Sequence, residues 1–171
     1  MASTSNAIIQ YNSYSNMIRT YNVFVSFRGE DTRNNFTDFL FGGLSRNEIE
    51  AFKDNTHLHK GESIAPELLQ AIQASRIFIV VFSKNYASST RCLCELAHIC
   101  NCIQTSPRRV LPIFYDVDPS EVRRQSGCYE TAFAEHEERF RKDKKMMEDV
   151  QVWKETLIKV ANLAGWDIQN K

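Results

Sequence analysis

The stretch Arg76-Ile-Phe-Ile-Val-Val-Phe82 is almost wholly apolar, and nearly all of its residues are β-branched or aromatic. Such a run is typical of a strand that is covered on both faces, as in a parallel sheet. Two further apolar runs, Tyr21–Phe27 and Val110–Tyr115, and the shorter Ile49–Phe52 are also predicted strands. Pro112 weakens the prediction of a strand over Val110–Tyr115, because proline has no N–H to donate to the hydrogen bonds between strands.

Between these strands, apolar residues recur at helical spacing. They predict helices over residues 35–44, 67–75, 90–104, 129–142 and 147–164, with Gly165 ending the last one. Strands that alternate with helices indicate an open, mainly parallel sheet with helices on both faces. Right-handed crossovers then favour a flavodoxin-like α/β arrangement.

The totals fit one domain and exclude several classes of protein. The chain has 171 residues, with 21 basic and 21 acidic side chains, so no basic excess indicates nucleic-acid binding. No apolar run reaches the roughly 18 residues that a membrane span requires. Residues 1–20 are rich in Ser and Asn and lack the pattern of a signal peptide, so we expect a flexible tail.

The cysteines are predicted to be free thiols in a reducing cytosol. There are five, an odd number, and four of them lie within one predicted helix, which argues against a disulfide framework. The pairs Cys92/Cys94 and Cys100/Cys102 have one intervening residue, whereas zinc pairs typically have two to four. No metal site is expected. The four histidines are assigned surface or packing roles, with His136 in polar surroundings.

Polar loops follow the predicted strands at the edge where open α/β sheets bind ligands. They include Arg28–Arg33 after the first strand and Ser83–Tyr86 after the central one. A phosphoacceptor receiver domain would need an aspartate where Ser83 stands, so that class is excluded. The sequence also has no Gly-x-Ser-x-Gly elbow and no phosphate-binding Gly-x-x-x-x-Gly-Lys run.

One further candidate residue is a glutamate in a predicted helix, outside these loops. Glu95 lies near the start of the helix over residues 90–104, among the apolar neighbours Leu93, Leu96 and Ala97. Those neighbours could desolvate its carboxylate for catalysis. Alternatively, Glu95 is a first-turn residue that stabilises the helix dipole. Spacing alone favours the second interpretation.

Several stretches, in order, closely resemble plant Toll/interleukin-1 receptor (TIR) domains, the amino-terminal modules of nucleotide-binding, leucine-rich-repeat immune receptors. The matching stretches are Tyr21–Arg33, Lys60–Ile64, Ala71–Arg76, Val80–Ser89, Cys92–Leu96 and Val110–Arg123. The resemblance implies a five-stranded, flavodoxin-like TIR fold over residues 21–166. Residues 167–171 would then lead toward a nucleotide-binding domain.

The resemblance also implies an activity, cleavage of NAD+ or NADP+ at the nicotinamide–ribose bond, with the dinucleotide as substrate and no separate cofactor. It makes Glu95 the catalytic residue, in place of the helix-dipole interpretation. The residues that it assigns to the nucleotide site are Arg28, Gly29, Arg33, Lys60, Gly61, Ser83 and Cys92. Arg33 could instead pair with Glu30 or Asp31.

Plant TIR domains are also self-associating signalling modules, so TIR–TIR contacts, possible contacts with other TIR receptors and a cytoplasmic or nucleo-cytoplasmic location are implied. Arg91 replaces a tryptophan that is usual in the family, and Asp38 and Phe39 replace a Ser-His pair of one association surface. Gly127 matches a glycine of the second surface, although it could be a plain helix-entry glycine. These departures keep a second reading open, in which the domain is a non-enzymatic adaptor.

Overall fold

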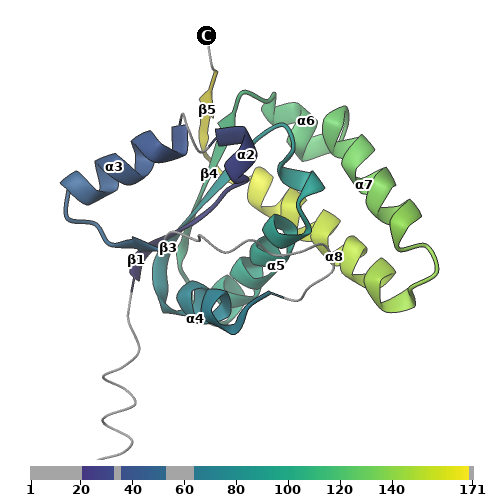
Figure 1. The fold of residues 1–171 in the computed structure, drawn as a ribbon, viewed down its shortest axis with the longest axis horizontal. Coiled ribbons are helices and arrows are strands. Elements are labelled where there is room, and N and C mark those ends of the chain that lie inside the picture. Colours follow the sequence, from purple (N-terminus) through teal and green to yellow (C-terminus); the bar gives the residue numbers. More distant parts are fainter. Residues whose placement is uncertain (1–20, 33–35, 53–63, 170–171) are drawn as a thin grey trace, which may run out of the picture.

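The computed structural model describes residues 21–32, 36–52 and 64–169. Its strands are β1 (Tyr21–Ser26), β2 (Ala51–Phe52), β3 (Ser75–Phe82), β4 (Arg109–Tyr115) and β5 (Trp166–Ile168). They form one parallel, five-stranded sheet in the order β2-β1-β3-β4-β5 (Figure 1). This order confirms the predicted flavodoxin-like fold with its five strands.

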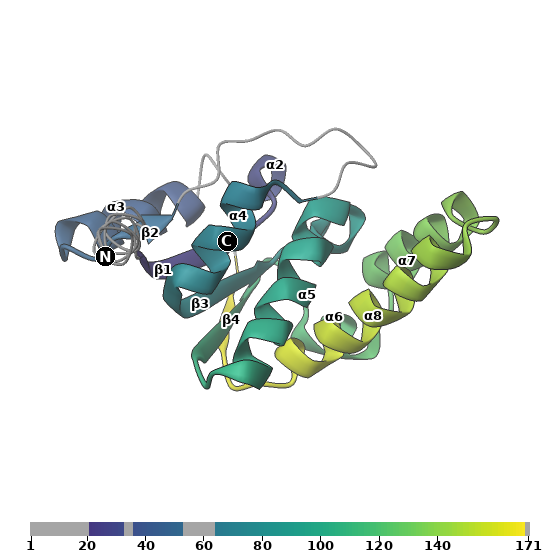
Figure 2. The same ribbon diagram turned by 90° about the horizontal axis from the view of Figure 1, so that it is seen from below.

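Helices flank the sheet on both sides. They are α2 (Gly29–Thr32), α3 (Asp38–Arg46), α4 (Pro66–Ala74), α5 (Thr90–Thr105), α6 (Pro119–Arg124), α7 (Cys128–Arg139) and α8 (Lys144–Ala161), with a 3-10 turn η2 (Tyr86–Ser88). Figures 1 and 2 show the sheet separating α3 from α5 and α8. Two layers of helix therefore enclose the strands, as predicted.

The central strand β3 divides the core in two. Phe78, Val80 and Phe82 point into the cluster under α4, α5 and α8. Ile79 and Val81 point into the cluster on which α3 lies. Because successive side chains of a strand face opposite sides, an almost wholly apolar run is what a strand buried on both faces requires.

Four short elements, among them α2 and η2, match none of the residue ranges predicted for helices and strands, and the other two follow β4 in the chain. The first is α6, which has only six residues, with Val122 alone buried; Asp118 caps it by accepting a hydrogen bond from the Ser120 N–H at 2.9 Å. The second is β5, which has three residues and pairs with β4. The sheet therefore continues past residue 166, where the predicted domain ends. Short elements carry too few apolar positions to show a period.

The predicted role of Gly165 as the stop of the last helix is wrong, because α8 ends at Ala161 with Asn162 as its cap. A Cβ at Gly165 would lie 2.1 Å from the carbonyl oxygen of Pro112. Glycine is thus required where the chain passes β4 on its way into β5. Pro112 sits at this same end of the β4–β5 ladder, whose pairing begins one residue later, at Ile113 with Trp166.

Candidate functional site

The loop after β1 is closed by its own arginine. The Arg28 guanidinium binds Asp31 Oδ1 through NH1 and Glu30 Oε2 through NH2, each at 2.9 Å. The two acids therefore have Arg28 as their partner. Arg33, which the resemblance assigns to the nucleotide site with pairing to these acids as the alternative, lies outside the described residues together with Lys60 and Gly61. Gly29 begins the single turn α2 that shapes this loop.

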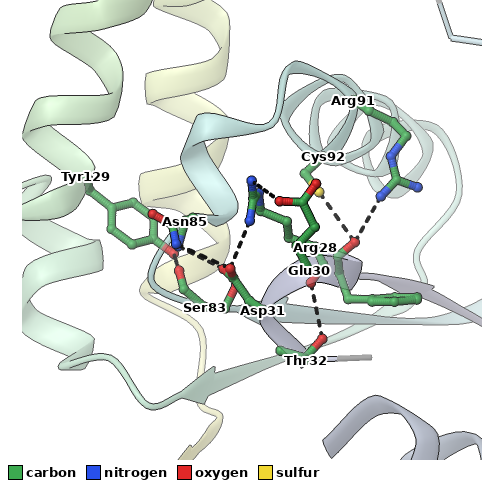
Figure 3. A network of polar contacts seen from close by, with 10 residues as sticks. Arg28, Glu30, Asp31, Thr32, Ser83, Asn85, Arg91, Cys92 and Tyr129 are labelled. Atoms are coloured by element: carbon green, nitrogen blue, oxygen red, sulfur yellow. Dashed lines mark hydrogen bonds and ion pairs between the residues drawn. The ribbon is translucent and has the colours of Figure 1, made fainter. Parts of the chain in front are cut away.

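Asp31 links this loop to the loop after β3 (Figure 3). Its Oδ2 accepts hydrogen bonds from Ser83 Oγ at 2.6 Å and from the Asn85 backbone N–H at 2.9 Å, and its Oδ1 accepts one from Asn85 Nδ2 at 3.2 Å. Burial alone would raise the pKa of Asp31, but these hydrogen bonds and the Arg28 charge lower it below its usual value. Asp31 is therefore ionised. Its carboxylate forms a structural joint, by which we mean that it binds the loop after β1 to the loop after β3.

Ser83 is buried at this joint, and both of its polar oxygens are engaged. Its hydroxyl donates to Asp31, and its carbonyl oxygen accepts a hydrogen bond from the Tyr129 hydroxyl at 2.7 Å. Ser83 thus connects the site to α7 (Figure 3). Its predicted contact with a nucleotide stays a prediction, and the observed bonds give the residue a structural role of its own.

Glu95 lies in the second turn of α5, buried at the same edge of the sheet. The helix begins at Thr90, after the cap Ser89, whose side chain accepts a hydrogen bond from the Cys92 N–H. The first turn contains no acidic residue, so the interpretation of Glu95 as a first-turn dipole residue is wrong. Glu95 is 1% exposed, and its Oε1 lies 3.3 Å from Arg91 NH1.

Arg91 and Cys92 connect α5 to the last residue before the loop. The Phe27 carbonyl oxygen accepts hydrogen bonds from Arg91 NH2 at 3.2 Å and from Cys92 Sγ at 3.5 Å (Figure 3). Burial, reinforced by the Glu95 carboxylate, raises the pKa of Cys92 to about 12. Cys92 is therefore a protonated thiol that donates a hydrogen bond, and its chemistry is that of a packing residue.

The structure thus brings Arg28, Gly29, Ser83, Cys92 and Glu95 to one edge of the sheet, and their roles in a nucleotide site stay a prediction. The contact of Arg91 with Glu95 was missed by sequence reasoning, which treated Arg91 only as the loss of an aromatic side chain. Its spacing of i, i+4 from a glutamate was the available signal, because residues four apart on a helix are neighbours.

The predicted association residues lie on α3 and at the start of α7. Phe39 is 74% exposed on α3, beside the exposed Asp38. Gly127 stands at the entry of α7 with a φ of 58°, and a Cβ there would lie 2.2 Å from Glu121 Oε1. That carboxylate accepts a hydrogen bond from the Cys128 N–H at 2.8 Å. Local backbone geometry therefore accounts for the glycine, and its association role stays a prediction.

The described residues also bear on the expectations about disulfides, metal sites and membrane-spanning helices. All five cysteines are described and are free, and no cluster of three or more His, Cys, Asp or Glu side chains there could hold a metal ion. His136 is buried, not in polar surroundings, and its Nε2 lies 2.7 Å from the Ala87 carbonyl oxygen. No helix of the described part has the length and apolarity to cross a membrane.

The sheet order and the polar edge at the ends of β1 and β3 define a flavodoxin-like α/β domain. The chain belongs to the TIR domain family, whose pattern it matches over residues 20–171. A solved structure titled as the TIR domains of the activated Roq1 resistosome is 48% identical, with a TM-score of 0.76, and the match covers 86% of this chain and 87% of that one.

Similar curated proteins include plant disease resistance proteins. RPV1 of Vitis rotundifolia is 51% identical over 149 residues, which is 87% of this chain and 10% of that protein. The TMV resistance protein N of Nicotiana glutinosa is 47% identical over 146 residues, or 85% of this chain and 12% of that protein. The chain therefore spans about a tenth of the length of these relatives.

Proposed function

We propose that this TIR domain hydrolyses NAD+ or NADP+ at the nicotinamide–ribose bond, as the signalling step of a plant disease-resistance receptor. The observation that carries the proposal is the buried carboxylate of Glu95 at the ligand-binding edge of the sheet. A carboxylate in a partly desolvated site is a common catalytic group. The loop Arg28–Thr32 lies across from it, joined through Phe27.

The reaction needs only one carboxylate. When the C–N bond breaks, its electron pair goes to the positively charged nicotinamide ring, which leaves neutral and needs no general acid. The ribose carbon acquires oxocarbenium character, which a nearby carboxylate stabilises electrostatically. Water then adds to that carbon and loses a proton, giving ADP-ribose. The carboxylate of Glu95 therefore suffices, and no second carboxylate is needed as a general acid.

The loop after β1 has the chemistry to hold the dinucleotide. A guanidinium binds phosphate oxygens through paired N–H groups, and Gly29 permits close approach of a phosphate to the backbone. Arg28 already donates to Glu30 and Asp31 through NH2 and NH1, so a phosphate that binds both terminal nitrogens competes with these two partners. The Glu30 contact is the easier to give up, because the Glu30 side chain is 83% exposed.

The test is nicotinamide release at protein concentrations that produce assemblies, or in a crowding agent. Glu95→Ala should abolish release while circular dichroism shows an intact fold. Glu155→Ala, the same change at an exposed glutamate of α8, should leave release at the wild-type rate. Turnover that persists in Glu95→Ala would contradict the assignment.

A second candidate is a non-enzymatic adaptor that signals through TIR–TIR contacts. It is favoured by the large exposed side chain of Phe39 and by the resistosome in which the TIR domains of the Roq1 structure are assembled. The two candidates differ in one result: an adaptor forms assemblies without releasing nicotinamide. Assemblies that release none would decide for the adaptor.

A further inference from the structure

Arg91 and Glu95 form an ion pair across one turn of α5. Arg91 NH1 lies 3.3 Å from Glu95 Oε1, and the two side chains are 17% and 2% exposed, respectively. Of the pair, Arg91 is therefore the member that reaches solvent. A carboxylate that is this buried cannot contact a ribose until its surroundings move.

The same guanidinium also binds the loop. Its second terminal nitrogen, NH2, donates to the Phe27 carbonyl oxygen at 3.2 Å (Figure 3). Phe27 directly precedes the loop Arg28–Thr32, so one side chain joins Glu95 to the start of the proposed nucleotide wall. The rigid planar fork of arginine allows both contacts at once.

We propose that Arg91 is an inhibitory latch on Glu95: the pair holds the carboxylate away from the ribose, and the site turns over only when the pair opens. This inference rests on the proposed hydrolase function and names a regulatory element of that same site. Arg91 acts through Glu95, so it is a positioning residue.

Electrostatics explains why the latch inhibits. The carboxylate is needed to stabilise positive charge on the ribose, and a guanidinium beside it neutralises that field and repels the developing cation. The pair is little exposed, so solvent screens it less than a surface pair.

The latch also couples the loop to the carboxylate. Displacement of Phe27 would break the hydrogen bond from Arg91 NH2 to its carbonyl oxygen, which would free the guanidinium to move away from Glu95. Contacts between neighbouring domains that shift this loop would thereby switch the site on.

The experiment compares Arg91→Met with Arg91→Lys, the double variant Arg91→Met/Glu95→Gln, and a matched control. The control is Arg108→Met, because Arg108 also donates to backbone carbonyls, those of Ile72 and Ser75, at 3.1 and 3.0 Å. Arg91→Met should raise kcat for nicotinamide release by about ten-fold or more, with a smaller change in KM. Arg91→Lys, which keeps the cation but not the fork, should raise kcat less than Arg91→Met does, and the double variant should be inactive.

A purely structural Arg91 would lower the melting temperature without raising kcat. The proposal is therefore overturned if Arg91→Met is no faster than wild type while Glu95→Ala is inactive, a result that leaves the hydrolase function standing. It is also overturned if Arg108→Met gives the same increase, because general loosening would then explain both.

If no variant releases nicotinamide, the hydrolase function fails and the latch is judged by chemistry alone. Glu95 is then labelled with a carbodiimide and an amine, and its peptide is quantified by mass spectrometry. Labelling should be about ten-fold faster in Arg91→Met than in wild type if the pair shields the carboxylate. Equal labelling in the two proteins would overturn the latch.

Discussion

Ser83 Oγ donates to Asp31 Oδ2 at 2.6 Å, although 52 residues separate the two in the chain. This bond joins the loop after β1 to the loop after β3, which are neighbouring strands of the sheet. Because Asp31 also accepts from Asn85 and pairs with Arg28, one carboxylate holds both loops in position. The geometry of the proposed site therefore depends on a residue outside the reaction itself.

Asp31→Asn should destabilise the domain by about 1–3 kcal/mol, because the amide has one acceptor oxygen for the three donors of Ser83 and Asn85 and for the Arg28 guanidinium. Urea unfolding followed by circular dichroism measures this difference. Glu30→Gln is the control, since the Glu30 side chain is 83% exposed and should lose much less. Equal stability of Asp31→Asn and wild type would show that the joint contributes little.

The contribution of Asp31 should depend on pH. Its pKa is lowered in the folded protein from 3.8, so the stabilisation is complete above that pH and is lost as the pH falls through the folded pKa. The difference in unfolding free energy between wild type and Asp31→Asn should therefore be largest near neutrality and shrink below about pH 4. A difference that stays constant between about pH 7 and about pH 3 would contradict this sign.

Gly127→Ala should cost about 1–3 kcal/mol of folding free energy, because its φ is positive and the new Cβ would meet the Glu121 carboxylate. Gly43→Ala is the matched comparison: it lies within α3, has ordinary space for a Cβ, and should stabilise by roughly 0.5–1 kcal/mol. Thermal unfolding measures both. If Gly127→Ala keeps its melting temperature but loses self-association, the glycine is needed for the association surface and not for the backbone conformation at the start of α7.

Gly165→Ala should destabilise by at least about 2 kcal/mol, since its Cβ would overlap the Pro112 carbonyl and force β5 away from β4. Ala164→Ser, at the exposed neighbouring position, should change stability by less than about 0.5 kcal/mol. Both values come from urea unfolding. Similar stabilities for the two variants would contradict this prediction, because the backbone at residue 165 could then move away from Pro112 without loss of stability.

Phe39→Ser should weaken self-association if α3 contributes a contact surface, because it removes a large apolar side chain that is 74% exposed. Sedimentation velocity over a range of concentrations measures the shift. Val152→Ser is the control on α8, where an apolar side chain is 45% exposed. Equal weakening in both variants would indicate a general effect of surface apolarity.

Much of the fold follows from the sequence. The run Arg76–Phe82 is typical of a strand buried on both faces, and the alternation of strands and helices indicated the parallel sheet that is observed. The short elements α6 and β5 were missed because capping and neighbouring strands, not apolar periodicity, define them. The role of Gly165 was also misinterpreted, because the requirement for glycine at that position comes from Pro112 on the neighbouring strand β4.

The sequence by itself determined the class of protein and indicated the edge of the sheet where a ligand would bind, and its resemblance to TIR domains made Glu95 the candidate carboxylate. Only the tertiary structure decided what the polar residues at that edge contact: that Arg28 pairs with both acids, that Ser83 is bonded to Asp31, and that Arg91 lies against Glu95. The reason is physical. Apolar periodicity is a local property of the chain, whereas a hydrogen bond or an ion pair depends on distances that only the packed strands and helices set.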